Sequence, residues 1–251
     1  MIHITGDTHS DFRRFTTLAF PEQKEMTKDD YVIICGDFGG VWYQEDSNEI
    51  KRENYWLDWL ENKPFTTLFV DGNHENFNRL YKYPVKEFNG GLVHEIRPHV
   101  LHLIRGEVFN LQGYKFFAFG GASSHDISDG ILNMDEVDKI KLWRKQRKMF
   151  RVRDLSWWDL ELPTQDEMRH GIETLEKHNF DVDFVISHCA PQNVVSLFSH
   201  GLFKPDILTT YFDELIERGL KLNAWFHGHY HDNQKNLGKY VMLYEQIVRI
   251  V

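Results

Sequence analysis

The ten residues Tyr31-Val32-Ile33-Ile34-Cys35-Gly36-Asp37-Phe38-Gly39-Gly40 contain the pattern from which the fold can be deduced. A short apolar run that ends in a turn-forming cluster indicates a buried strand followed by a sharp turn. Five other apolar runs end in polar clusters in the same way. They are Ile2 to Thr5, Thr66 to Val70, Phe116 to Phe119, Val182 to Ile186 and Ala224 to Phe226. The sequence therefore predicts a set of buried strands spread over the whole chain.

The segments between the first strands favour helices. From Ser47 to Asn62, apolar side chains recur at the spacing of one helical face. Strands that alternate with helices imply a largely parallel sheet. Later, Gln112-Gly113 separates the strand-like runs Glu107–Leu111 and Tyr114–Phe119, and Tyr240 to Val251 is again strand-rich, which indicates antiparallel hairpins and a second sheet. We expect an α/β fold in a single domain that covers residues 1–251, because no linker or repeat divides the chain.

The segment from Ser123 to His170 follows this rhythm least well. It is rich in charged residues and tryptophan, and we expect a mainly helical insertion that could act as a lid. Within it, Lys139 to Arg153 contains eight lysines and arginines and no acidic residue. One interpretation is a solvated helix face that nearby carboxylates balance, and the other is a surface that recruits a polyanionic substrate.

The composition limits the class of protein. A formal net charge of −9 argues against a surface built throughout to coat nucleic acid. No apolar run approaches the ~20 residues that span a bilayer, and Met1 to Ile4 does not resemble a signal peptide, so we expect no membrane segment. The only cysteines, Cys35 and Cys189, each follow or end an apolar run, which favours reduced thiols and a cytoplasmic location.

Metal-binding residue types follow strand after strand. The clusters are Gly6-Asp7-Thr8-His9, Gly36-Asp37, Gly72-Asn73-His74-Glu75, Ser187-His188 and Gly228-His229-Tyr230-His231. Loops at the carboxyl ends of strands in an α/β sheet meet at one crevice, so ligands far apart in sequence can form one site. A glycine before the ligand would allow the sharp turn that aims the next side chain into that crevice.

Seven of these residues are candidate metal ligands: Asp7, His9, Asp37, Asn73, His188, His229 and His231. Carboxylate, amide oxygen and imidazole together suit divalent ions such as Mn²⁺, Fe²⁺, Zn²⁺ or Ni²⁺, and we expect Mn²⁺. Seven ligands exceed the needs of one ion. Two ions about 3.5–4 Å apart, bridged by one carboxylate and a water, would use them all. Asp37 is the natural bridge.

The ordered set Asp7-x-His9, Gly36-Asp37, Gly72-Asn73-His74-Glu75, His188 and Gly228-His229-x-His231 resembles the calcineurin-like metallophosphoesterase superfamily. The resemblance implies a four-layer α/β/β/α sandwich. It also implies that Asp7, His9 and His231 hold one metal, that Asn73, His188 and His229 hold the other, and that Asp37 is shared. In the scheme of that family, a metal-bridging hydroxide attacks phosphorus while His74 stabilises the phosphate oxygens or protonates the leaving group.

One position departs from the pattern of that family. Many members read Gly-Asp-x-x-Asp, whereas this chain has Gly40 at the last position and so lacks the carboxylate that often orients the histidine acid. Asp11, Asp71 or Glu75 could substitute, although each of them is also a common turn or capping residue.

Several residues outside the motifs remain open to interpretation. His125 could contact substrate or be a plain loop residue, and His227 could support the site or pack within a strand. Trp157 and Trp158 could stack on a nucleobase or anchor the insertion to the core. The other histidines are expected to be structural or exposed. These are His3, His94, His99, His102, His170, His178 and His200.

The sequence as a whole indicates an enzyme that hydrolyses a phosphomonoester or phosphodiester with two metal ions. A nuclease or nucleotide phosphodiesterase that grips a polyanion with residues 139–153 is the alternative. A binding protein that keeps the fold without activity is a third reading, which the intact ligand set opposes.

Overall fold

The computed structural model describes residues 1–233 and 235–251, and most of its strands form two mixed sheets. The first sheet runs in the order β15 (Ile247–Arg249), β1 (Ile2–Thr5), β2 (Tyr31–Ile34), β3 (Thr66–Phe69), β6 (Val100–Leu103), β5 (Gly91–Arg97), β4 (Val85–Phe88). The second runs β13 (Lys235–Leu237), β14 (Tyr240–Met242), β12 (Ala224–His227), β11 (Phe184–Ser187), β8 (Tyr114–Phe119), β7 (Glu107–Leu111).

The central strands of both sheets are parallel, as their alternation with helices predicts. In the first sheet β1, β2, β3 and β6 run parallel, with antiparallel strands at both edges. In the second, β8, β11, β12 and β14 run parallel, and β7 and β13 are antiparallel. The hairpin at Gln112-Gly113 is confirmed, whereas the C-terminal strands β14 and β15 belong to different sheets.

The two sheets face each other across the main core. Successive side chains of a strand point to opposite faces, so Ile33 of β2 enters the core between the sheets while Val32 and Ile34 point to the outer face. Residues of both sheets meet in the inner core. They include Ile4, Leu68 and Leu101 of the first sheet and Phe116, Ile186 and Phe226 of the second.

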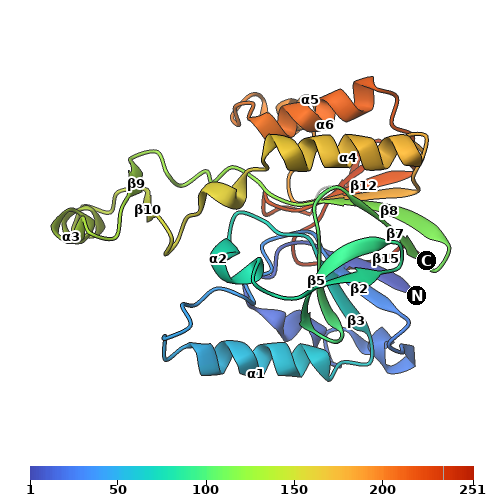
Figure 1. The fold of residues 1–251 in the computed structure, drawn as a ribbon, viewed down its shortest axis with the longest axis horizontal. Coiled ribbons are helices and arrows are strands. Elements are labelled where there is room, and N and C mark those ends of the chain that lie inside the picture. The colour runs from blue at the N-terminus through green and yellow to red at the C-terminus, as the bar shows by residue number, and fades with distance from the viewer. Residues whose placement is uncertain (234) are drawn as a thin grey trace.

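Helices cover the outer face of each sheet (Figure 1). Helix α1 (Ile50–Glu61) buries Leu57 and Leu60 against the first sheet. On the second sheet, α4 (Gln165–Lys177) and α6 (Ile207–Glu217) pack on β8, β11 and β12, and α5 (Gln192–Ser199) lies beside α6. The predicted four-layer α/β/β/α sandwich is therefore confirmed. The remaining short helices are α2 (Phe77–Leu80) and the 3-10 turns η1 (Phe12–Phe15) and η2 (Pro21–Glu25).

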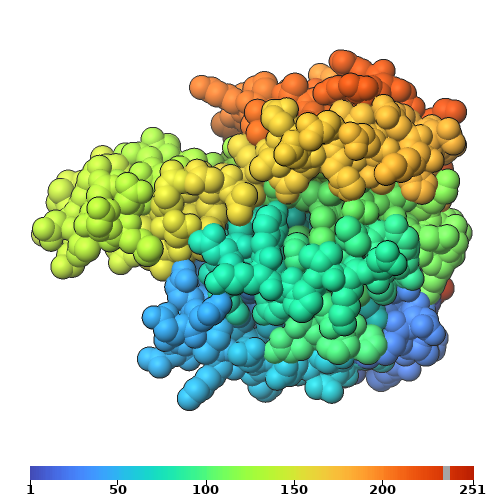
Figure 2. Space-filling view, viewed as in Figure 1, coloured from blue at the N-terminus to red at the C-terminus, as the bar shows by residue number. Residues whose placement is uncertain are grey.

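Residues 123–164, which we call the arm, project from this sandwich at one end (Figures 1 and 2). The arm contains the parallel strand pair β9 (Gly130–Leu132) and β10 (Phe150–Val152), helix α3 (Val137–Lys145) and the 3-10 turn η3 (Asp159–Glu161). Its small core consists of Leu132, Ile140 and Val152. Residues 165–170 instead begin α4, where Thr164 and Glu167 form a capping box. The segment is thus less helical than the sequence predicts, because it also contains the strand pair on which α3 packs.

Among the described residues, no helix combines the length and the apolar character that a crossing of the bilayer requires.

Candidate metal centre

The seven predicted ligands all lie in loops directly after strands. They are Asp7 and His9 after β1, Asp37 after β2, Asn73 after β3, His188 after β11, and His229 and His231 after β12. The three strands of the first sheet and the two of the second run parallel within their sheets, so their carboxyl ends bring the loops to one edge of the sandwich. The convergence predicted from the motif positions is therefore observed.

Four of these residues have an unusual backbone. His9, Asp37, His229 and His231 have φ angles of 45°, 44°, 71° and 52°, in the left-handed region that side chains with a Cβ rarely adopt. Such conformations cost on the order of 1–3 kcal/mol each and persist where the surrounding structure imposes them, most often at functional sites. The loops therefore hold these four residues in strained backbone conformations that direct their side chains toward the site.

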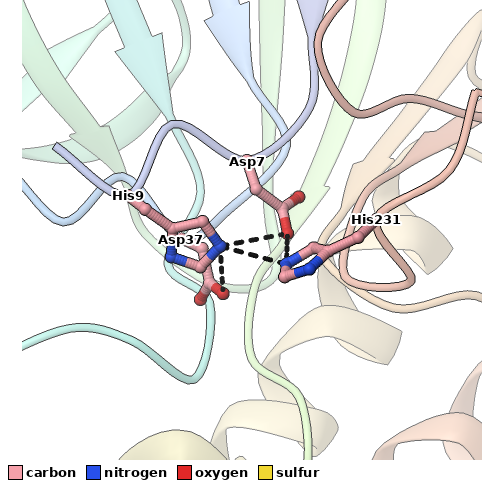
Figure 3. Close-up of side chains that lie close together, drawn as sticks. All are labelled: Asp7, His9, Asp37 and His231. Carbon is pink, nitrogen blue, oxygen red and sulfur yellow. Dashed lines mark hydrogen bonds and ion pairs between the residues drawn. The ribbon is translucent and has the colours of Figure 1, made fainter. Parts of the chain in front are cut away.

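Asp7, His9, Asp37 and His231 form one compact group (Figure 3). One ligand atom of each lies within 4.8 Å of the ligand atoms of the other three. His9 Nε2 is 3.0 Å from His231 Nε2 and 3.6 Å from Asp37 Oδ2, and His231 Nε2 is 3.1 Å from Asp7 Oδ2. Two carboxylates and two imidazoles in one such group are a suitable ligand set for a divalent metal ion.

The other predicted ligands extend from the opposite side of Asp37. His188 Nε2 lies 3.2 Å from Asp37 Oδ1 and 3.3 Å from Asn73 Oδ1. His188 Nδ1 is 2.7 Å from the Cys35 carbonyl oxygen, which leaves Nε2 as the ligand atom. The ring centroid of His229 is 4.8 Å from that of His188. The two oxygens of Asp37 therefore face two different sets of ligands.

The glycines before the ligands are required mainly by close packing. A Cβ on Gly72 would lie 2.0 Å from Asp37 Oδ1, and a Cβ on Gly228 would lie 2.0 Å from Asp7 Oδ1. Neither glycine has a positive φ, so the sharp turn that the sequence predicts is not their role. Gly36 does adopt a φ of +88°, and its Cβ would lie 2.2 Å from His188 Nδ1.

The electrostatics of the group favour a bound cation. Burial alone would lower the pKa of His188, but the carboxylates of Asp37 and Asp7 outweigh it and raise that pKa to about 10. A hydrogen bond to Asp7 raises the pKa of His231. Burial lowers the pKa of His9 and, with help from His188 and His125, that of His229. The carboxylates thus hold positive charge at their centre, and a metal ion can supply that charge in place of protons.

The donor set fits divalent metal ions. Oxygen and imidazole ligands are present without a thiolate, since the buried Cys35 offers its carbonyl to His188. Asp7, His9, Asp37 and His231 would hold one ion. Asn73, His188 and His229 lie on the side of the second oxygen of Asp37, where the residues would hold another.

His74 lies next to these ligands without joining the compact group. Its backbone N–H donates to Asp37 Oδ1 at 2.8 Å, and its ring packs edge-on against His9 at 5.2 Å. Its Nε2 is 3.5 Å from Nη2 of Arg151, a residue of strand β10 in the arm, and Arg151 in turn pairs with Asp126. Burial lowers the pKa of His74, so the ring is mostly neutral near pH 7.

None of the three carboxylates that could replace the missing one at Gly40 contacts the ring of His74. Asp11 pairs with Arg13, and Glu75 accepts the N–H groups of Phe38 and Gly39. Asp71 is bound to His102 and Arg105. The suggested substitution is therefore wrong. Arg151 was visible in the sequence as part of the basic run, but the fold alone brings it to His74.

A pocket of about 290 Å³ opens over the centre. Its lining adds four residues to the predicted ones Asp37, Asn73, His74, His229 and His231, namely His125, Asp126, Phe203 and Tyr230. His125 stacks on Phe203 at 4.3 Å, and its Nε2 is 3.2 Å from His229 Nε2. His125 is thus a residue of the site. A second hollow, bordered by His9, Trp42 and Tyr43, also touches His74.

The remaining candidates from the sequence are structural. His227 is buried in β12 near Phe198. Trp157 and Trp158 are buried at the base of the arm, and Trp158 packs edge-on against Trp42 at 5.4 Å, so they anchor the arm and leave no face for a nucleobase.

The basic run is only partly neutralised within the arm. Lys139, Lys148, Arg151 and Arg153 form ion pairs, with Glu136, Asp129, Asp126 and Asp159 respectively. A groove along the arm is lined by Arg144, Lys148 and Arg151 together with Asp126, which also borders the pocket over the centre. The reading as a balanced surface therefore holds for half of the run, and two of the balanced cations, Lys148 and Arg151, also line the groove next to the site.

Comparison with known proteins matches residues 1–233 to the calcineurin-like phosphoesterase family. Among curated proteins, the chain is similar to the lariat debranching enzyme of Homo sapiens, with 23% identity over 92% of this chain and 42% of the relative. It is 29% identical to that of Drosophila pseudoobscura pseudoobscura over 51% of this chain and 25% of the relative. It is 31% identical to the lariat debranching enzyme of Arabidopsis thaliana over 32% of this chain and 22% of the relative. The chain thus spans less than half the length of these relatives.

Proposed function

This chain belongs to the calcineurin-like phosphoesterase family of hydrolases, as its motifs predict, and on that premise we propose that it hydrolyses a phosphodiester bond with two divalent metal ions. Asp7, His9 and His231 are proposed to hold one ion and Asn73, His188 and His229 the other, with Asp37 between them. Mn²⁺ is the proposed metal. The compact Asp7, His9, Asp37 and His231 group supports the first position, and the two-sided contacts of Asp37 support the second.

A diester is favoured over a monoester by the space around His74. A diester carries an organic group on each of two oxygens, so it needs room on both sides of the phosphorus. His74 borders two hollows, one over the centre and one beside Trp42 and Tyr43. The first of these also shares Asp126 with the groove along the arm. The presence of these two hollows, both bordered by His74, is the observation that carries the proposal.

The residues of the chain divide the work between them. Bound metal ions would activate water and neutralise charge on the phosphate. His74 is half-buried and mostly neutral near pH 7, so its ring N–H can donate to a phosphate oxygen, and a ring that has taken up a second proton can transfer that proton to the leaving oxygen. Arg151, 3.5 Å from His74, adds a positive charge on the side of the arm.

A polymeric substrate is supported by the groove and by the relatives. Arg144, Lys148 and Arg151 line the groove that leads away from the centre, and a chain of phosphates would bind there through its charge. The curated relatives are named lariat debranching enzymes, so we propose a nucleic acid as the substrate class. A cytoplasmic location is proposed too, which the buried free thiols Cys35 and Cys189 support.

An activity screen of the Mn²⁺-loaded protein tests the proposal. The panel contains a lariat, the linear nucleic acid of the same sequence, a cyclic nucleotide, a nucleotide monoester and nitrophenyl mono- and diesters. The proposal expects diesters to be hydrolysed faster than monoesters. Preference for monoesters would replace it by a phosphatase, and binding without turnover on any substrate with any of Mn²⁺, Fe²⁺, Zn²⁺ or Ni²⁺ would indicate a binding protein.

A further inference from the structure

The base of the arm is fastened to the metal centre through two residues that the family motifs do not include. Glu161, in the turn η3, accepts the backbone N–H of Ser124 at Oε1 (2.9 Å) and the Ser124 hydroxyl at Oε2 (2.6 Å). Ser124 Oγ is in turn 3.3 Å from Nδ2 of Asn73. All three side chains are buried, with exposed fractions of 3%, 7% and 4%. A continuous chain of hydrogen bonds therefore links Glu161 to Asn73.

The side chain of Asn73 has two nearly identical ends with opposite functions. Its Oδ1 can bind a metal ion, whereas its Nδ2 carries two hydrogens and cannot. A rotation of 180° about the last side-chain bond exchanges the two ends and leaves the shape unchanged. In the structure Oδ1 faces His188 Nε2 at 3.3 Å and Nδ2 faces Ser124. Something in the surroundings must therefore favour this orientation.

The single hydroxyl proton of Ser124 favours this orientation. A carboxylate has no proton to give, so Glu161 can only accept, and Ser124 must donate its proton to Glu161. The lone pairs of Ser124 Oγ then remain for Asn73, and they accept a hydrogen bond only from an N–H group. We propose that Glu161, acting through Ser124, is a positioning residue that turns the amide oxygen of Asn73 toward the second metal position.

The surroundings hold Glu161 in place for this role. The backbone carbonyl of Glu161 accepts the N–H of Ala122 at 3.1 Å, and Arg105 donates to the neighbouring Leu160 carbonyl at 2.8 Å. Burial raises the pKa of Glu161 to about 7, although the hydrogen bonds from Ser124 oppose this rise. The carboxylate form therefore prevails in the slightly alkaline buffer chosen for the test.

The substitution Glu161→Gln tests the inference with little change in shape. If the oxygen of the new amide keeps the backbone N–H of Ser124, its NH₂ group donates to Ser124 Oγ, and the hydroxyl proton then turns toward Asn73. The amide of Asn73 is expected to flip, which presents NH₂ to the metal. Titration with Mn²⁺ at pH 8, with free Mn²⁺ followed by electron paramagnetic resonance, should show one of two sites weakened by roughly 10–100-fold, as is usual for residues that support a metal ligand.

Asn73→Asp supplies the decisive second variant, because a carboxylate has an oxygen at both ends. Combined with Glu161→Gln, the carboxylate introduced by Asn73→Asp can accept the Ser124 proton and still offer an oxygen to the metal. With Glu161 unchanged, its carboxylate and the one introduced by Asn73→Asp compete for the single hydroxyl proton of Ser124. The double variant should therefore bind the second ion more tightly than either single variant. Ser124→Ala, with and without Asn73→Asp, repeats the test if Glu161→Gln prevents folding, and here Asn73→Asp should again restore affinity.

Glu107→Gln is the matched control, since Glu107 is also buried but lies on β7 and pairs with His170. This variant should bind both ions as the wild type does. The inference rests on the proposed two-metal function, and the outcomes separate the two. A wild type that binds fewer than two ions overturns both. The positioning role alone is overturned if the wild type binds two ions and both affinities are unchanged in Glu161→Gln and in Ser124→Ala. It is also overturned if the effects of these variants on affinity simply add to the effect of Asn73→Asp.

Discussion

At the scale of single residues, Asp37 is the point where the two halves of the centre meet. Oδ2 lies 3.6 Å from His9 and Oδ1 lies 3.2 Å from His188, so each oxygen serves one half. Asp37→Ala should therefore reduce binding at both metal positions. His231→Ala should weaken one position only, because His231 contacts Asp7 and His9 alone among the ligands. Metal content after reloading and desalting measures the difference.

Circular dichroism serves as the control for folding in this comparison. Asp37 also accepts the N–H of His74, and its loss could loosen the loop after β3. Asp37→Asn keeps an oxygen and the size of the side chain, and should still lower the affinity of both positions because the negative charge is gone. Equal loss of a single ion in Asp37 and His231 variants would contradict the bridging assignment.

His74 is expected to act in the chemical step. His74→Asn removes the ring but keeps the backbone N–H that donates to Asp37. We expect metal binding to persist and kcat to fall, by ~10²–10⁴-fold if a proton is transferred in the transition state. The fall should be larger for an alkoxide leaving group than for nitrophenolate, which departs without a proton. Steady-state rates with an alkyl and a nitrophenyl ester of matched charge measure this.

The metal content of His74→Asn must be determined in the same samples, since a metal-depleted variant would lose both activities together. Arg151→Lys provides a companion variant that keeps the charge near His74 while removing the guanidinium 3.5 Å from its ring. An equal, modest deficit on both esters in fully loaded His74→Asn would refute the acid role and assign His74 to electrostatic contact with the phosphate.

At the scale of elements, the arm is anchored at its base and carries the groove that we propose binds substrate. Trp158 fixes its base against Trp42, and the strand pair and α3 project beyond the sandwich. Replacing Arg144, Lys145, Arg147 and Lys148 by Ala should raise KM for a polyanionic polymer more than for a small nitrophenyl ester. The reason is that a polymer extends along the arm, whereas a small ester occupies only the pocket. Measuring KM for both substrates at several salt concentrations tests this, and the salt dependence for the polymer should become weaker in the variant.

A variant that loses the same number of positive charges outside the arm controls for the overall electrostatic field of the protein. Arg169 and Lys177 on α4, with Arg218 and Lys221 after α6, supply four cations on the helical side of the second sheet. Their replacement by Ala should change KM for the polymer much less. If both sets change KM equally, or if the arm variant affects both substrates alike, the cations of the arm are a solvated surface.

The secondary-structure elements show how much of the fold could be predicted from the sequence. Strands β1, β2 and β3, with the hairpin of β7 and β8, were predicted within a residue or two because a buried strand between turn residues has a strong pattern. The segment from Ser123 to His170 was expected to be mainly helical, but besides α3, η3 and the start of α4 it contains two strands and long loops. Its strands β9 and β10 are three residues long and pair across 17 intervening residues, so they leave too weak a periodicity to recognise. The same limit explains why Glu161, Ser124 and Arg151 were missed as site residues: only the folded arm brings them there.

At the scale of the whole molecule, a buried ionic network joins the layers near the centre. Asp71, at the end of β3, accepts from Arg105 (3.0 Å from Nε) and lies 3.0 Å from His102 Nε2. Arg105 also donates to Leu160 at the base of the arm, and the Asp71 carbonyl accepts the N–H of Gly121 after β8. The network thus ties the first sheet to the second sheet and to the arm.

Asp71→Asn should destabilise the whole fold by about 3–5 kcal/mol, because it leaves the buried Arg105 cation with only the more exposed Glu167, 3.5 Å away, as a counter-charge. The double variant Asp71→Asn with Arg105→Met should be less destabilised than the sum of the single changes, since it removes the Arg105 charge as well.

The stabilisation by Asp71 should also depend on pH. Burial would raise the pKa of Asp71, but Arg105 and His102 outweigh burial and hold that pKa below its usual range. The unfolded chain therefore takes up a proton first as the pH falls below about 4, and the stabilisation by Asp71 is present above that pH and lost below it. Urea unfolding of the metal-free proteins should accordingly show a wild-type advantage over Asp71→Asn that is constant from pH 7 to 5 and shrinks toward pH 3. An advantage that does not change over this range, or single effects that simply add, would mean that the Asp71–Arg105 pair is not what holds the two sheets and the arm together.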